Sequence, residues 1–380
     1  MLQEIKKRLI RNIKNMPGWH IDRKIVIIEC DDWGSIRMPS RDVSNLLSQR
    51  GSKFSPHFFN LYDKLESSKD LEQLYDALTS VKDGNGRFAI MTAMTNVANP
   101  DFEKIRSHGY EEYYYEPFTK TLQDYYPNDN VFKQWIEGIS AGIFIPELHG
   151  REHINVLMWM QKLREGDPDL LIAFDHRFVY MNLPGLSPPA QEFGAELYFT
   201  AEDQKPFLVN SIKEGASLFW NIFGSSPHVF VPPNGISHPE FDHTIADCGI
   251  KFLYANHFMP YPVRGGRLRY RYLSDGQIGP GGITYYMRNC AFEPSSTSYQ
   301  GIDRTLEQIA AAFKWGKPAN ISSHRVNFAG GIDQKNREKG FRELSKLLKA
   351  IVHNWPDTEF MSSAEALEIM KKANYKISKV

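Results

Sequence analysis

Short apolar runs alternate with helical patterns along the chain, and several of these runs end in polar residues. The first run, at residues 24–28, is rich in β-branched residues and leads into Asp31, Asp32 and a glycine turn. A strand that is apolar on both faces is typical of a parallel sheet whose two faces are both covered. About seven or eight such strand–helix units predict one α/β barrel with its polar residues at the carboxyl ends of the strands.

The remaining elements follow from the period of the apolar residues. Helices are expected at residues 41–50, 70–81, 131–140, 205–223, 238–248, 302–315, 333–353 and 364–373. Strands are expected at residues 87–96, 142–146, 227–231, 251–255, 283–287, 318–323 and 359–361, with another possible at 170–174 and a turn-rich break at 184–189. No internal repeat or linker interrupts the pattern, so residues 1–380 are expected to form a single elaborated barrel.

Two segments stand outside this alternation. Residues 1–20 interleave lysine and arginine with leucine and isoleucine, which predicts an amphipathic helix. We expect its apolar face to pack on the barrel, although a basic amphipathic helix can also lie on a membrane. Residues 97–130 are acidic and rich in tyrosine, and they are too long for a simple connection. They predict an insertion or lid between the second and third strands.

The overall charge gives no sign of a nucleic-acid or anionic-membrane partner, because 45 basic residues balance 45 acidic ones. Three cysteines are too few for a disulfide framework and favour a reducing, cytoplasmic location. The first residues contain no uninterrupted apolar core and no small-residue cleavage site, so neither a signal peptide nor an integral membrane segment is expected. The oligomeric state stays open.

His149 and His153 stand four residues apart, just after a predicted strand. If a helix begins at or just before His153, both rings can reach the same side, since residues four apart share a helix face. A divalent metal held by two neutral imidazoles favours a carboxylate as third ligand. Asp31 and Asp32, at the end of the first strand, are the obvious donors, so these two strand ends together predict a metal site.

With these residues in view, the sequence resembles the polysaccharide deacetylase superfamily, the NodB-like, carbohydrate esterase family 4-like enzymes built on an irregular (β/α)7 barrel. Two of the family's motifs, a strand ending Thr-Phe-Asp-Asp-Gly and His-(Ser/Thr)-x-x-His, are similar to residues 29–34 and 149–153. Its Arg-Pro-Pro-Tyr-Gly motif, its strand ending in histidine and its closing segment are similar to residues 231–235, 321–324 and 360–367. The resemblance implies parallel barrel strands, with the long insertion between strands 2 and 3.

The resemblance also implies a metal-ligand set. Asp32, His149 and His153 are expected to hold one divalent transition metal, with zinc as the first choice. A metal with three protein ligands lowers the pKa of a bound water and polarises an acyl oxygen.

Three further residues receive roles from the same resemblance. Asp31 is expected to be the general base, and His324 the general acid that protonates the leaving group. The backbone N–H of Asn234 is expected to stabilise the oxyanion.

The sequence departs from the family where the arginine that orients the base should stand, since that position is Val231. Four arginines could replace it, and the sequence does not choose among Arg37, Arg151, Arg288 and Arg325. Glu293 lies near the place of the family's fourth motif, but no match is recognisable there.

The function that follows is the metal-dependent removal of an N- or O-acetyl group from a saccharide or polysaccharide. Two alternatives stay open. The same barrel could be a glycoside hydrolase that uses two carboxylates. It could also be a saccharide-binding protein that lost its activity with the missing arginine.

Overall fold

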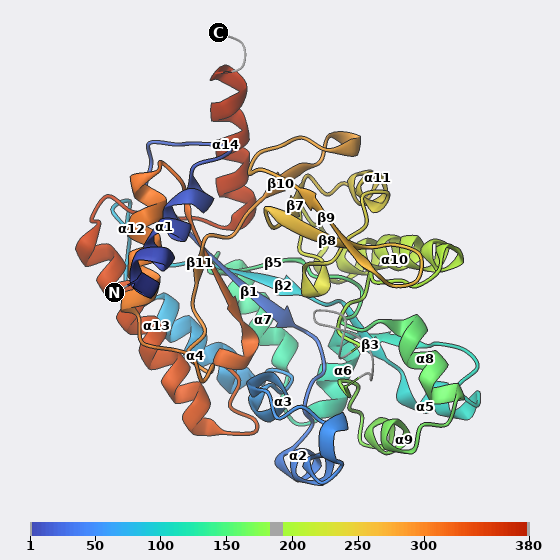
Figure 1. Ribbon diagram of the computed structural model, residues 1–380. Coiled ribbons are helices and arrows are strands. Elements are labelled where there is room, and N and C mark those ends of the chain that lie inside the picture. Colours follow the sequence, from blue (N-terminus) through green and yellow to red (C-terminus); the bar gives the residue numbers. More distant parts are fainter. Residues whose placement is uncertain (1, 183–192, 378–380) are drawn as a thin grey trace.

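The computed structural model describes residues 2–182 and 193–377 (Figure 1). The turn-rich break predicted at residues 184–189 lies outside them. The main sheet is parallel, and β1 (Ile25–Trp33) is buried along its whole length near its middle. The spatial order of the strands is β10 (Thr284–Tyr286), β7 (Phe252–Tyr254), β6 (Val229–Phe230), β5 (Phe144–Leu148), β2 (Met91–Thr95), β1, β12 (Ala319–His324) and β11 (Cys290–Ala291). A further short strand, β13 (Glu359–Phe360), pairs with the start of β1.

The two edge strands of this sheet, β10 and β11, are consecutive in the chain and only three residues apart. β10 pairs with β7 and β11 pairs with β12, so the two short strands share the place of one interrupted strand. The chain itself therefore joins the two edges, and the sheet curls into a barrel with seven strand positions. The predicted fold class, an α/β barrel of parallel strands, is confirmed.

Helices cover the outside of the sheet (Figure 1). The helices on the side of α4 (Ser68–Leu78) are α7 (Val131–Ser140), α12 (Asp303–Lys314) and α13 (Gln334–Asn354), and those elsewhere are α2 (Arg41–Ser48), α3 (Phe58–Tyr62), α10 (Lys205–Phe223), α11 (Phe241–Asp247) and α14 (Ser363–Ile377). Local signals fix their ends: Ser67 and Asp70 form a capping box at the start of α4, and Gly224 ends α10 in the left-handed conformation. The largest apolar cluster fills the space between the sheet and α4, α7, α12 and α13.

Residues 170–174, considered as a strand, belong instead to α9 (Pro168–Asp175), so that prediction is wrong. Asp167 caps the first turn and Pro168 occupies a first-turn position, where its missing N–H costs nothing. A short apolar run fits either structure, and here the capping residues decide for a helix. The antiparallel hairpin of β8 (Phe258–Pro262) and β9 (Leu268–Tyr272) was not predicted from the sequence.

The predicted insertion at residues 97–130 folds into a small unit of its own. β3 (Ala98–Pro100) and β4 (Tyr115–Pro117) pair in antiparallel fashion, and α5 (Phe102–Ser107) and α6 (Phe118–Tyr125) accompany them. The unit packs against α9 and α8 (Val156–Arg164), since the ring of Phe102 lies 5.9 Å from that of Trp159 and 5.0 Å from that of Phe174. Its role as a lid stays a prediction.

The N-terminal helix α1 (Leu2–Asn15) lies on the barrel beside α12, but through polar side chains. Arg11 pairs with Glu307, and the indole N–H of Trp315 donates to the Asn12 side-chain oxygen at 2.8 Å. The described aliphatic side chains of α1 are exposed to solvent, since Leu9, Ile10 and Ile13 are each more than half exposed. The expectation that its apolar face packs on the barrel is therefore wrong for the described side chains.

The three cysteines, Cys30, Cys248 and Cys290, are free thiols in the structure. Within the described residues, 2–182 and 193–377, no helix is both long enough and apolar enough to cross a membrane. The cytoplasmic location inferred from the cysteine content stays a prediction.

A buried ion-pair group joins the end of β12 to the segment before α4. Arg325 is fully buried, its Nε lies 3.0 Å from Asp63 Oδ1, and its Nη1 lies 2.8 Å from Glu66 Oε2. Removing one member of such a group leaves charge buried without compensation, which costs more than the pair itself contributes.

We expect Arg325→Leu to lower the free energy of unfolding by about 3–5 kcal/mol at neutral pH, because Asp63 and Glu66 stay buried without a cation. Urea unfolding followed by circular dichroism measures this. Arg342→Leu is the control, since the exposed Arg342–Glu343 pair at 3.7 Å should contribute less than about 1 kcal/mol. Equal losses in the two variants would contradict the prediction.

Candidate active site

Asp31 and Asp32 both reach the carboxyl-terminal rim of the barrel because β1 is irregular there. In a regular strand, neighbouring side chains point to opposite faces. Here the pairing of β1 with β2 shifts register between Cys30 and Trp33, and Asp32 adopts a left-handed backbone with φ 74°. Such a bulge re-aims a side chain, and both carboxylates line the same cavity.

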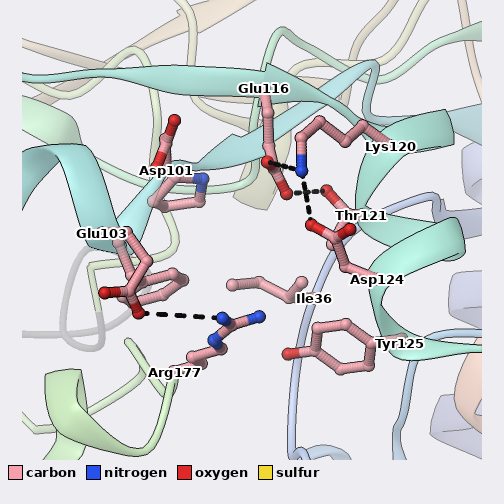
Figure 2. Close-up of a pocket in the computed structure, with 11 residues that line it drawn as sticks. Ile36, Asp101, Glu103, Glu116, Lys120, Thr121, Asp124, Tyr125 and Arg177 are labelled. Atoms are coloured by element: carbon pink, nitrogen blue, oxygen red, sulfur yellow. Dashed lines mark hydrogen bonds and ion pairs between the residues drawn. The ribbon is translucent and has the colours of Figure 1, made fainter. Parts of the chain in front are cut away.

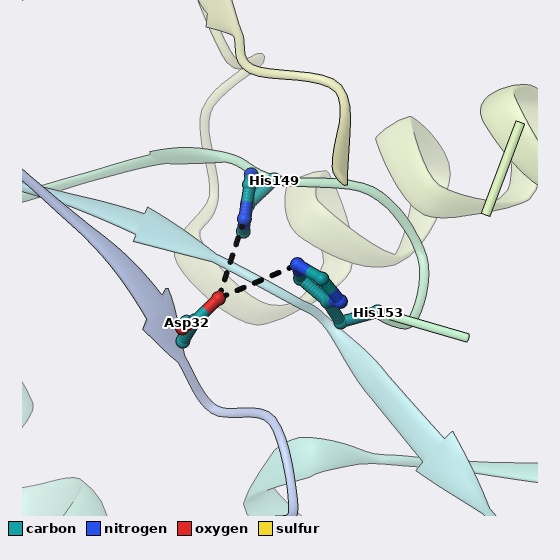
Figure 3. A group of neighbouring side chains, drawn as sticks. All are labelled: Asp32, His149 and His153. Carbon is teal, nitrogen blue, oxygen red and sulfur yellow. Dashed lines mark ion pairs between the residues drawn. The ribbon is translucent and has the colours of Figure 1, made fainter. Parts of the chain in front are cut away.

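His149 and His153 follow β5 on a loop, so the proposed helix for this pair is wrong. The helix α8 begins only at Val156, with Asn155 as its N-cap. The loop turns at Gly150, whose φ of 95° favours glycine. It brings the two imidazole rings to a centroid distance of 5.2 Å, and both face Asp32 (Figure 3).

Asp32, His149 and His153 are buried and fit a metal ion. The Nε2 atoms of both histidines lie 3.5 Å from Asp32 Oδ1, and one ligand atom from each residue lies within 4.8 Å of the others. A tetrahedral ion with ligands at about 2.1 Å holds its donors about 3.4 Å apart. The spacing is thus close to that of a ligand set.

The protonation of the two imidazoles also suits metal binding. His149 Nδ1 lies 2.7 Å from the carbonyl oxygen of Val231, which makes Nδ1 the donor and leaves the Nε2 lone pair facing Asp32. Burial lowers the pKa of His153 to about 4, so its ring is neutral near pH 7. A neutral imidazole is the form that binds metal.

Arg288 takes the place of the arginine that the sequence lacks at Val231. Its Nη1 and Nη2 lie 2.6 and 2.7 Å from the two carboxylate oxygens of Asp31, and its Nε lies 2.5 Å from Glu29. Burial alone would raise the pKa of Asp31, but the charge of Arg288 holds it below its ordinary value. Asp31 is therefore an ionised carboxylate in a fixed orientation.

The other three candidate arginines have different partners. Arg37 stacks on the ring of Tyr180, at 3.6 Å from the ring centroid. Arg151 pairs with Glu152 at 2.6 Å and also with Glu214. Arg325 binds Asp63 and Glu66, whereas Arg288 forms an ion pair with Asp31.

Glu293 is a site residue that sequence reasoning did not assign. Its Oε1 lies 2.6 Å from His324 Nδ1, while His324 Nε2 lies 3.8 Å from Asp31 Oδ2. Burial would lower the pKa of His324, but the charge of Glu293 and its hydrogen bond raise it to about 10. Its position could have suggested this role, because Glu293 follows strand β11 by two residues and so lies at the rim of the barrel. This strand was not recognised in the sequence.

These side chains surround a cavity of about 540 Å³. Its wall carries all six residues singled out in the sequence: Asp31, Asp32, His149, His153, Asn234 and His324. Asn234 belongs to the turn Pro233–Gly235 and has a left-handed backbone with φ 54°. The described residues of the wall include none from residues 97–130.

A second cavity, of about 160 Å³, lies on the insertion (Figure 2). Its two cations are already paired with carboxylates: Lys120 lies 3.3 Å from Glu116 and 2.6 Å from Asp124, and Arg177 lies 3.8 Å from Glu103. It offers no ligand set comparable to that of the larger cavity.

No family model and no curated protein matches the chain. Its structure is similar to that of 4-alpha-glucanotransferase from Thermococcus litoralis, with 12% identity, a TM-score of 0.45, and coverage of 91% of this chain but only 40% of that one. It is also similar to a protein described as a glycoside hydrolase/deacetylase from Parabacteroides distasonis, with 10% identity, a TM-score of 0.49, and coverage of 94% and 73%.

Peptidoglycan deacetylase PdaC from Bacillus subtilis is similar at 10% identity and a TM-score of 0.40, with 94% of this chain and 95% of that chain covered. Polysaccharide deacetylases are thus among the solved structures that this chain resembles. Identities of 12% or less and TM-scores below 0.5 are too low to transfer an activity, so the function has to come from the chemistry of the site itself.

We expect Glu293→Gln to lower the pKa of His324 from about 10 toward the ordinary value of about 6.5, because the negative charge that favours the imidazolium is removed. Titration of the histidine ring signals by NMR measures the shift. The signals of His20 and His108, both on the surface, serve as the internal control. An unchanged His324 titration would show that Glu293 does not set its charge.

Proposed function

We propose that the chain is a metal-dependent hydrolase that removes an N- or O-acetyl group from a saccharide. The observation that carries this proposal is an acid–base pair beside a metal-ligand set in one cavity. Asp31 is kept ionised and His324 is kept cationic, while Asp32, His149 and His153 converge next to them. Acyl transfer to water needs these three functions together.

The metal ligands of this proposal are Asp32, His149 and His153. The fit rests on three buried donors within 4.8 Å of one another, on the 3.5 Å distances from Asp32 Oδ1 to both Nε2 atoms, and on the hydrogen bond that fixes the tautomer of His149. A divalent ion, with zinc as the first candidate, lowers the pKa of a water molecule and polarises the acyl oxygen when it is bound.

Asp31 acts as the general base toward the attacking water. Its carboxylate stays ionised because Arg288 binds both of its oxygens, so it is ready to take a proton near neutral pH. Arg288 is in turn held by Glu29, whose carboxylate also accepts hydrogen bonds from Ser363, Asn320 and Tyr286. The base therefore rests on a buried network that keeps its orientation fixed.

His324 acts as the general acid toward the leaving amine or alcohol. It starts the reaction protonated because Glu293 stabilises its imidazolium, and Nε2 is the atom that faces Asp31. The ring of Phe59 packs edge-on against it at 4.9 Å, which limits its motion. The backbone N–H of Asn234, on the same cavity wall, is proposed as a donor to the oxyanion.

The cavity wall also suits a saccharide. Phe59 and Tyr254 contribute aromatic rings, and Asn256 and Ser55 contribute hydrogen-bonding groups. A volume of about 540 Å³ accommodates one or two sugar rings.

Neither alternative function gains support from the site. A glycoside hydrolase needs one carboxyl group that stays protonated. The carboxylates on the described cavity wall are Asp31 and Asp32, and the pKa of each is held low. A protein silenced by the missing arginine is also not favoured, since Arg288 binds Asp31 in its place.

We expect purified protein to bind about one equivalent of divalent metal per chain and to release acetate from acetylated saccharides in a chelator-sensitive way. His149→Ala and Asp32→Ala should lose the metal, and activity should fall roughly a thousandfold, because the metal contributes several kcal/mol to catalysis. Elemental mass spectrometry and an acetate assay on the same samples measure both. Asp31→Asn is the matched control, which should keep the metal and lose the activity. Full metal content in His149→Ala would refute the ligand assignment.

We expect Arg288→Met to lower kcat/KM by roughly a hundredfold while the metal content stays unchanged, since general-base catalysis contributes about 10²–10⁴. The pKa of Asp31 should rise when the guanidinium is removed, so the acidic limb of the pH–rate profile should move to higher pH. Steady-state kinetics across pH tests this, with the surface variant Arg342→Met as control. An unchanged acidic limb would contradict the role of Arg288.

A further inference from the structure

Large apolar side chains are exposed mainly in two places. Among the described residues, ten such side chains are exposed, and eight of them belong to residues 9–16 or 258–278. The first group consists of Leu9, Ile10, Ile13 and Met16, and the second of Phe258, Tyr270, Tyr272 and Ile278. Single exposed apolar residues are ordinary, but a concentration of this kind marks an interaction surface.

The hairpin β8–β9 exposes one face and buries the other. Phe258 pairs with Tyr272, and Pro260 with Tyr270, so Phe258, Tyr270 and Tyr272 share the outer face and are 57–66% exposed. On the inner face, Met259 is buried and Arg271 binds Asp242 at 2.6 Å. The hairpin is therefore anchored to the barrel, and its aromatic outer face is not part of the core.

The hairpin and the end of α1 are neighbours. His257 Nε2 lies 2.9 Å from the carbonyl oxygen of Lys14, and the backbone N–H of Trp19 donates to Asp275 at 3.0 Å. Both elements lie in the foreground of Figure 1. The eight exposed apolar residues thus lie on two neighbouring elements, which together are here named the α1–hairpin surface.

The turn end of the hairpin is basic although the whole chain is neutral. Residues 256–274 contain no aspartate or glutamate, and Arg264, Arg267 and Arg269 are exposed near the hairpin turn. The exposed Lys6 adds a positive charge on α1. A balanced total of charges hides this local excess, and its partner should be anionic.

We propose that the α1–hairpin surface docks this protein on an anionic membrane. Aliphatic residues on a basic amphipathic helix insert at the boundary of headgroups and acyl chains, tyrosine rings lie at the headgroup level, and arginines bind anionic headgroups. A second copy fits less well, because a symmetric contact pairs the surface with itself, and residues 256–274 offer no acidic group to Arg264, Arg267 and Arg269. An anionic polysaccharide could pair with the arginines, but it would bind through hydrogen bonds that Leu9, Ile10 and Ile13 cannot form.

Docking in this way would also orient the active site. Asn256, two residues before β8, lines the large cavity. The hairpin therefore starts at the wall of this cavity, so docking through the hairpin would hold the cavity close to the membrane. If the proposed deacetylase function holds, its substrates would be saccharides attached to, or held near, a membrane.

Vesicle co-sedimentation tests the proposal with the full chain and without any substrate. Wild type should bind vesicles of phosphatidylcholine with about one third phosphatidylglycerol, but not phosphatidylcholine alone, and added salt should weaken the binding. Arg264→Gln/Arg267→Gln/Arg269→Gln should lower the partition coefficient about tenfold or more. Leu9→Gln/Ile13→Gln should lower it to a similar extent, and both sets are exposed positions where the fold is retained.

Trp220→Ala is the matched control, since Trp220 is an exposed aromatic residue on α10, outside this surface. It should bind vesicles like wild type, and so should His149→Ala, which separates docking from catalysis. Absence of wild-type binding, or full binding by both variant sets, overturns the proposal. Two other results, if vesicle binding is absent, also overturn the proposal. One is a dimer in analytical ultracentrifugation that the Leu9→Gln/Ile13→Gln variant dissociates, and the other is retardation of the protein by hyaluronan in gels.

Discussion

The contact between Arg288 and two carboxylates of β1 is the interaction on which the active site depends. Arg288 lies in the three-residue gap between β10 and β11, where the sheet closes on itself. From there it binds Glu29 and Asp31, which share one face of β1 because they are two residues apart. Burying three charges is costly unless each is paired. A guanidinium group placed where the sheet closes therefore also fixes the orientation of Asp31, the proposed base.

The second constraint is the left-handed backbone of Asp32. A non-glycine residue with positive φ costs about 1 kcal/mol or more, and Asp32 has φ 74° at the bulge that ends β1. A regular strand would send Asp31 and Asp32 to opposite faces. The strain lets one carboxylate face His149 and His153 while its neighbour faces Arg288 and His324. Two adjacent acids can then serve two different functions.

Much of this architecture could be predicted from the sequence, and the exceptions have physical reasons. The long helices and buried strands were found because their periods are clear, and the rim position of His149 and His324 followed from parallel topology. Arg288 and Glu293 could not be assigned, because β11 has only two residues and no pattern of its own. Residues 170–174 were considered as a strand because so short an apolar run is compatible with both a strand and a helix. The exposed face of α1 could not be foreseen, since amphipathicity does not show which side is covered.

Arg288 and Glu293 together show what the interrupted seventh strand contributes. They flank β11, and each shifts the pKa of one member of the proposed acid–base pair: Arg288 holds the pKa of Asp31 low, and Glu293 raises that of His324. A base and an acid that work at the same pH need environments that push their pKa values in opposite directions. One short segment supplies both environments because it carries a cation and an anion to two sides of a narrow rim. A continuous strand would have placed these side chains by simple alternation, whereas the break lets each be aimed separately.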